Sequence, residues 1–234
     1  MDDRTLVEVC CSSIDSVLKA QRCGADRIEL CKELRLDGLT PDDRLLERTC
    51  TQSSLPIHVL IRPREGDFHY SREELSLINQ QIQQALEYPI SGIVVGHLSF
   101  DLKPDLSLLN EWRSMVQGMD LTFHRAFDHV KDPFFVLEQL IDAGFNRVLT
   151  SGQAPKAVGG MELLHKLSSK ADKRITIMPG GGIDPLNAHL FLDGTFDAIH
   201  LSARPRDLAE GDEPVVDEVL LAEVTKSVKK QNRY

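Results

Sequence analysis

Hydrophobic runs recur along the chain in a regular rhythm. Short runs rich in β-branched residues appear about every 20 to 30 residues, and a segment with helical character follows each one. A strand–helix unit repeated eight times predicts an α/β fold, a single-domain (β/α)8 TIM barrel over residues 1–234. In that fold functional residues lie at the C-terminal ends of the strands. The predicted strands are Leu6–Cys10, Arg27–Cys31, Ile57–Ile61, Gly92–Gly96, Leu121–His124, Arg147–Thr150, Ile175–Met178 and Ala198–Ser202.

Capping and breaking residues delimit the predicted helices. Ser12 or Ser13 can cap a first helix that stops at Gly24, and Ser71 opens a capping box. The charged segment 204–214 is expected to be a mobile loop, and residues 215–230 to form a closing helix. The other helices are expected from Pro41, over Pro104–Val116, from Asp132-Pro133 to Gly144, over Gly159–Lys170 and, as a short seventh helix, from Asp184-Pro185.

The strands alternate between apolar and polar positions. In the first strand Val7 and Val9 share one side, and Glu8 and Cys10 share the other. The apolar set is expected to contact the helices, which directs the polar set towards the barrel axis. A purely structural barrel would fill its interior with Val, Ile and Leu. The polar interior therefore indicates a functional site. The alternative is a buried network in which Glu8 and Glu29 pair with arginines or with each other.

Composition narrows the class of protein. The 234 residues are 41% hydrophobic and 27% charged, with a formal net charge of −9 and no marked basic cluster. These values argue against a nucleic-acid partner. No apolar stretch is long enough to cross a bilayer, and the acidic start does not resemble a signal peptide, so a cytoplasmic location is expected. Five cysteines at irregular spacing do not suggest a disulfide framework.

Two thiols end the first two predicted strands. Cys10 and Cys31 occupy equivalent positions, and neighbouring strands lie about 4.8 Å apart, so both could hold one small ion. Thiolates favour soft metals, and a pair without a third Cys or a nearby His suits Cu(I) better than tetrahedral Zn²⁺. The alternative is that both thiols pack as small hydrophobic groups. Cys11, Cys23 and Cys50 are expected in the helix layer or at the surface.

Basic residues follow the third and fifth strands. Arg62 and Arg64 could bind a carboxylate or phosphate, as could Arg125, which follows His124. His124 has the ordinary pKa range for acid–base chemistry. The alternatives are an Arg–Glu pair that holds the loop and a histidine that is simply hydrogen-bonded in place.

A run of three glycines ends the seventh strand. Glycine lets backbone N–H groups approach an anion, and many barrels bind phosphate after strands seven and eight. Gly180, Gly181, Gly182 and Ser202 match that location. The alternative is a tight turn with no ligand.

Several motifs resemble the copper homeostasis protein CutC family. The resemblance runs in order from the first strand to about Arg204. It rests on residues 7–10, 24–31, 38–41, 61–64, 66–68, 122–128, 148–152 and 177–182. It implies a TIM barrel, a cytoplasmic protein and Cu(I) binding, with Cys10 and Cys31 matching the implicated cysteines.

Two functions follow as alternatives. The first is a Cu(I)-binding protein of copper homeostasis. The second is an enzyme that acts on a small anionic molecule, phosphorylated or not, and in which Glu8, Glu29 and His124 transfer protons. Either a copper ion or a small anion is the expected partner, and a homo-oligomer is expected.

Overall fold

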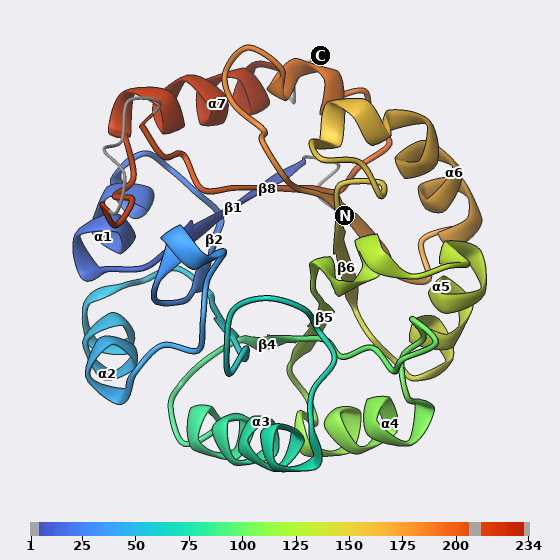
Figure 1. Cartoon of the computed structure of the whole chain (residues 1–234). Helices are drawn as coiled ribbons and strands as arrows, with labels where there is room; N and C mark the ends of the chain where they lie inside the picture. Colours follow the sequence, from blue (N-terminus) through green and yellow to red (C-terminus); the bar gives the residue numbers. More distant parts are fainter. Residues whose placement is uncertain (1–4, 206–211, 232–234) are drawn as a thin grey trace.

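Eight parallel strands form the barrel that the repeat predicts. In the computed structural model, which describes residues 5–205 and 212–231, the strands follow the order β7-β6-β5-β4-β3-β2-β1-β8. A parallel bridge between Gly180 and His200 joins β7 and β8, the first and last strands in this order. The strands therefore form a closed ring (Figure 1). The strands are β1 (Leu6–Cys11), β2 (Arg27–Leu30), β3 (Ile57–Leu60), β4 (Gly92–Val95), β5 (Asp120–Phe123), β6 (Arg147–Thr150), β7 (Thr176–Pro179) and β8 (Ala198–Leu201).

The helices surround the strands (Figure 1). Side-chain hydrogen bonds cap the N-termini of most of these helices. Ser13 caps α1, and Ser71 forms the predicted capping box of α3, which satisfies two backbone N–H groups. The helices are α1 (Ile14–Arg22), α2 (Asp43–Gln52), α3 (Arg72–Ala85), α4 (Leu106–Met115), α5 (Pro133–Asp142), α6 (Met161–Ala171) and α7 (Glu218–Gln231). Within the described part of the chain, no helix has the length and apolar character that a membrane crossing needs.

Two predicted segments differ from the structure. The short helix expected from Asp184-Pro185 is wrong, because that stretch is a turn followed by the 3-10 helix η4 (Ala188–Phe191). The Asp184 side chain accepts the N–H of Leu186, and the Asn187 side chain accepts the N–H of Asp184; such local bonds compete with a helix. The closing helix, expected over 215–230, begins only at Glu218.

The segment 204–214, expected to be a mobile loop, falls largely on residues 206–211. That prediction therefore lies outside the described residues.

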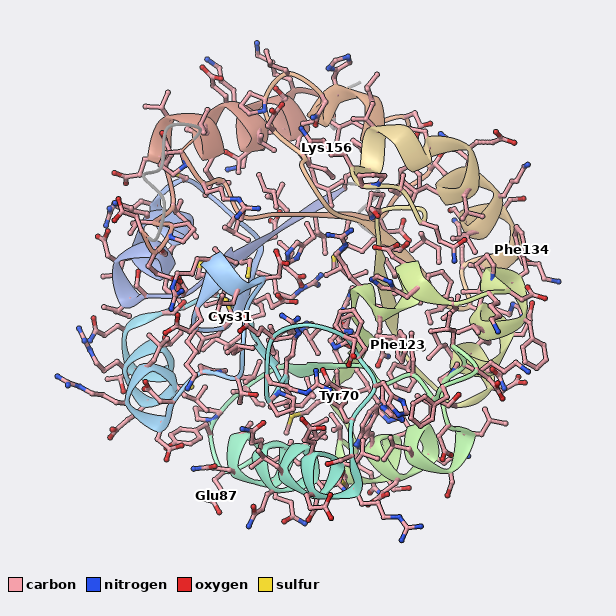
Figure 2. The ribbon with its side chains drawn as sticks, viewed as in Figure 1. Cys31, Tyr70, Glu87, Phe123, Phe134 and Lys156 are labelled. Carbon is pink, nitrogen blue, oxygen red and sulfur yellow. The ribbon has the colours of Figure 1, made fainter. Side chains whose placement is uncertain are left out.

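The core has an outer layer and an inner layer. Val7, Val9 and Cys11 belong to the outer layer between strands and helices, as their parity predicts. Cys10 and Cys31 belong to a separate inner cluster with three apolar side chains, Leu34, Leu60 and Val94. Figure 2 shows Cys31 on the inner side of the helix ring, whereas Glu87 and Phe134 lie at its outer edge. The alternation of the strands thus places the thiols in the barrel interior.

Candidate functional site

Three neighbouring strands bring a thiol, a carboxyl and an imidazole together. Cys10 on β1 is in register with Glu29 on β2, and His200 comes from β8 on the other side of β1. One ligand atom from each of these three residues lies within 4.8 Å of the other two. Cys10 and Glu29 are buried, and His200 is partly buried. The carboxyl ends of β8, β1 and β2 therefore form a compact group of possible metal ligands.

Cys31 adds a second thiol to this group. Its Sγ lies 3.3 Å from Cys10 Sγ, and Cys10 Sγ lies 3.4 Å from Glu29 Oε1. The hydrogen bond with Cys31, burial and the Glu29 carboxyl raise the pKa of Cys10 well above its ordinary value. The hydrogen bond with Cys10 lowers the pKa of Cys31, but burial and Glu29 outweigh it and raise that pKa. A metal ion that binds here must displace the thiol protons.

His200 is a possible metal ligand that the sequence interpretation did not assign. Its Nδ1 lies 2.8 Å from Glu8 Oε1, so this carboxylate orients the ring and leaves Nε2 for other contacts. The expectation of a thiol pair without a nearby histidine is therefore wrong. A signal was present: the parity of Ile199 and Leu201 directs His200 inward, and closure of an eight-stranded barrel places the last strand beside the first.

Glu8 belongs to a buried network of charged side chains. It lies on the same side of β1 as Cys10, two residues earlier in the strand. Its carboxylate pairs with Arg27 and lies 3.7 Å from His58 Nδ1. Although burial raises its pKa, Arg27 and His200 hold the pKa of Glu8 well below its ordinary value. This pair confirms part of the buried-network alternative. Glu8 does not line the cavity above, so its contact with the site is through His200.

Glu29 behaves differently from Glu8. It forms no salt bridge with any described residue, and its Oε2 atom is buried without a hydrogen-bond partner there. Burial raises the pKa of Glu29 above its ordinary value, against the opposing effect of His200. Its carboxyl group lines a cavity of about 650 Å³ at the mouth of the barrel.

His124 also lines this cavity. Its Nδ1 accepts the N–H of Ala126 at 3.1 Å, which places the ring proton on Nε2, a buried atom with no partner among the described residues. Burial and the positive charge of Arg62 lower the pKa of His124 to about 3. The ring is therefore neutral at neutral pH, outside the ordinary range expected from the sequence, and offers a hydrogen-bond donor to the cavity.

The three candidate arginines differ in position. Arg62 lines the cavity, but its terminal nitrogens donate to the backbone oxygens of Leu36, Gly38 and Gly66. Its Nε atom is buried and has no hydrogen-bond partner among the described residues. Arg64 does not line the cavity. It forms salt bridges with Glu74 at 2.5 Å and Asp67 at 3.0 Å. Arg64 therefore matches the alternative in which an Arg–Glu pair holds the loop.

Arg125 is the best placed of the three. It reaches the cavity while it binds Asp128 at 2.8 Å and the Ser151 hydroxyl at 3.1 Å. Its side chain remains 41% exposed, so part of the guanidinium is open to a ligand.

The glycine run follows β7 at the mouth of the barrel. Gly180 closes the barrel against His200, whereas Gly181, Gly182 and Ser202 line the cavity. Lys156 and Arg204 also line it, and the sequence interpretation assigned neither. Both belong to loops whose direction the strand pattern does not determine.

Comparison with known proteins gives consistent matches. The CutC family model matches residues 5–205. A family protein CutC from Pasteurella multocida is 42% identical over 205 residues, which cover 87% of this chain and 84% of the relative. A human protein named copper homeostasis protein cutC homolog is 42% identical over 200 residues, covering 85% of this chain and 73% of its own.

A solved structure matches as well. The putative copper homeostasis protein CutC from Streptococcus agalactiae superposes with a TM-score of 0.79 at 28% identity. The match covers 85% of this chain and 98% of that one.

Proposed function

Because the chain belongs to the CutC family, we propose that it binds Cu(I) through Cys10 and Cys31 and acts in copper homeostasis. The observation that carries this proposal is the 3.3 Å contact between the two Sγ atoms, at the end of two adjacent strands. Thiolates are the protein ligands that Cu(I) prefers. The copper ion is the cargo of such a protein, and the two cysteines are its principal ligands.

The surrounding donors fit a metal ion. Imidazole is a good ligand for copper, and His200 lies within 4.8 Å of the Cys10 and Glu29 ligand atoms. The Glu8 carboxylate on Nδ1 orients this ring and raises its basicity as a ligand. The unpartnered Oε2 of Glu29 supplies a further oxygen next to the thiols. His200 would thus complete the site, and Glu8 would hold His200 in place.

The same donor set also suits Zn²⁺. Two cysteines, one histidine and one carboxylate are ligands that zinc accepts in a tetrahedral site. Burial of Cys10 and Cys31, which are 4% and 0% exposed, favours an ion that needs few ligands and no water. The proposal therefore expects Cu(I) to bind in preference to Zn²⁺.

A competition titration tests the proposal. Reduced protein is titrated with Cu(I) in the presence of a chromophoric Cu(I) chelator, and separately with Zn²⁺. We expect about one Cu(I) per chain and a strong loss of affinity in Cys10→Ser and in Cys31→Ser, since one thiolate alone is a poor Cu(I) site. Cys23→Ser is the matched control, because Cys23 lies at the C-terminus of α1, remote from the barrel interior.

Two results would contradict the proposal. The first is unchanged Cu(I) affinity in the double variant Cys10→Ser, Cys31→Ser. The second is tighter binding of Zn²⁺ than of Cu(I) to the parent protein, which would assign the site to a different metal.

A further inference from the structure

The cavity above the thiols contains polar groups that copper binding does not use. Arg62 Nε and His124 Nε2 are buried and have no hydrogen-bond partner among the described residues. Arg62 is 5% exposed and His124 is 4% exposed, and both side chains line the cavity. Buried polar groups in native proteins are almost always hydrogen-bonded. Two unsatisfied N–H donors in one cavity therefore indicate a ligand that accepts hydrogen bonds.

The same cavity is lined by more cationic than acidic side chains, although the chain as a whole carries a net charge of −9. Its acidic lining residues are Glu29, Asp37 and Asp184. Arg125, Lys156 and Arg204 line it. Lys156 and Arg204 form no salt bridge with any residue of the described ranges, so their charges are available. A local group of cations at the opening of a cleft attracts anions and raises their local concentration.

The glycine turn places backbone donors beside these cations. Gly181 and Gly182 have φ values of +105° and +73°, which side chains rarely permit. A Cβ on Gly181 would lie 3.6 Å from the guanidinium carbon of Arg125, and one on Gly182 would lie 3.2 Å from the side chain of Lys156. The two glycines thus let the Arg125 guanidinium and the aliphatic part of Lys156 lie close against the turn, which brings both cationic side chains to its backbone.

We propose that this cavity binds a small phosphorylated molecule, separately from copper. The phosphate lies at Gly181 and Gly182 between Arg125 and Lys156, and the oxygen-bearing remainder reaches towards His124. A phosphate carries close to two negative charges and several acceptor oxygens, which matches several cations and backbone N–H groups better than a single carboxylate does. The volume of about 650 Å³ is ample for a phosphorylated sugar.

The two ends of the ligand have different partners. The phosphate end depends on Lys156, whereas the other end depends on the Nε2 donor of His124. Lys156→Ala removes one cation from an exposed side chain and leaves the core intact. His124→Asn removes Nε2 but retains an acceptor for the Ala126 N–H, which Nδ1 accepts in the parent protein. Lys166→Ala is the matched control, because Lys166 is an exposed lysine on α6 paired with Glu162.

Isothermal titration calorimetry on the reduced, copper-free protein separates these contributions. The probes are inorganic phosphate, ribose 5-phosphate and ribose. We expect ribose 5-phosphate to bind more tightly than phosphate, and ribose not to bind measurably. Lys156→Ala should weaken both phosphate-containing probes about tenfold, since a charge-assisted contact is lost. His124→Asn should weaken ribose 5-phosphate about fivefold and leave inorganic phosphate unchanged.

Three outcomes would overturn the inference. If Lys156→Ala binds phosphate as tightly as the parent and the Lys166→Ala control, the anion does not bind at the glycine turn. If ribose 5-phosphate binds no more tightly than inorganic phosphate, the cavity takes an ion and not a phosphorylated molecule. If His124→Asn binds ribose 5-phosphate like the parent, Nε2 does not contact the ligand.

Discussion

Replacement of Glu8 by Gln tests whether the buried charge network stabilises the barrel. The Glu8 side chain is 1% exposed and that of its partner Arg27 is 7% exposed, so the pair is almost fully removed from water. Gln has a similar size and shape but no charge. Glu8→Gln therefore leaves the Arg27 guanidinium buried without its counter-charge, and His200 without its carboxylate.

The expected loss follows from that burial. Removal of one partner from a buried ion pair costs about 3–5 kcal/mol, because the remaining charge stays desolvated. For a chain of this size, 1 kcal/mol lowers the melting temperature by about 2–4 °C, which gives a total of about 6–20 °C. Exposed ion pairs contribute only about 0–1 kcal/mol. Glu218→Gln is the matched control, since Glu218 pairs with Arg22 at 2.9 Å on the surface.

Urea unfolding at neutral pH measures both variants. The chain has a single tryptophan, Trp112, which is fully buried, so its fluorescence reports the loss of the fold. The double variant Glu8→Gln, Arg27→Met removes the uncompensated charge, and we expect it to be more stable than Glu8→Gln alone. A loss below about 1 kcal/mol in Glu8→Gln, or a double variant that is no more stable than the single one, would refute the reasoning.

Two further variants test the pH dependence and the closure of the barrel. His124 has a folded pKa of about 3 against an ordinary value of 6.5, so the unfolded chain binds a proton between these values that the folded chain does not. The free energy of unfolding should therefore fall as the pH decreases from about 6.5 towards about 3. Between about pH 7.5 and about pH 5.8, the free energy of unfolding of His124→Asn should decrease by about 1 kcal/mol less than that of the parent. Equal slopes in urea titrations at these pH values would refute a buried neutral His124. Gly180→Ala places a Cβ 2.5 Å from Leu149 Cδ1 and 3.2 Å from His200 Cβ, so overpacking should lower the free energy of unfolding by about 1–3 kcal/mol. An unchanged melting temperature would show that the β7–β8 junction can adjust without cost.

The strand pattern alone determined the fold and the interior of the barrel. Alternation in Val7-Glu8-Val9-Cys10 decides which side chains face the helices, because side chains on a strand point to opposite sides in turn. Equivalent positions were expected for Cys10 and Cys31, but the register pairs Cys10 with Glu29, and Cys31 follows the end of β2. The expected closeness of the thiols is nevertheless confirmed, since the Sγ atoms are 3.3 Å apart. Local bonds at Ser13 and Ser71 determined where helices begin, and such bonds can be predicted from a few residues.

Only the tertiary structure decided which polar groups share the site. His200 contacts Glu8, 192 positions away in the sequence, because ring closure places β8 beside β1. Arg62 is held by three backbone carbonyls, and Lys156 lies over Gly182, because the loops after the strands take these conformations. Strand periodicity constrains side-chain direction within an element, but loop paths depend on packing between distant segments. The sequence therefore determines the barrel and its inward residues, and long-range packing determines their partners.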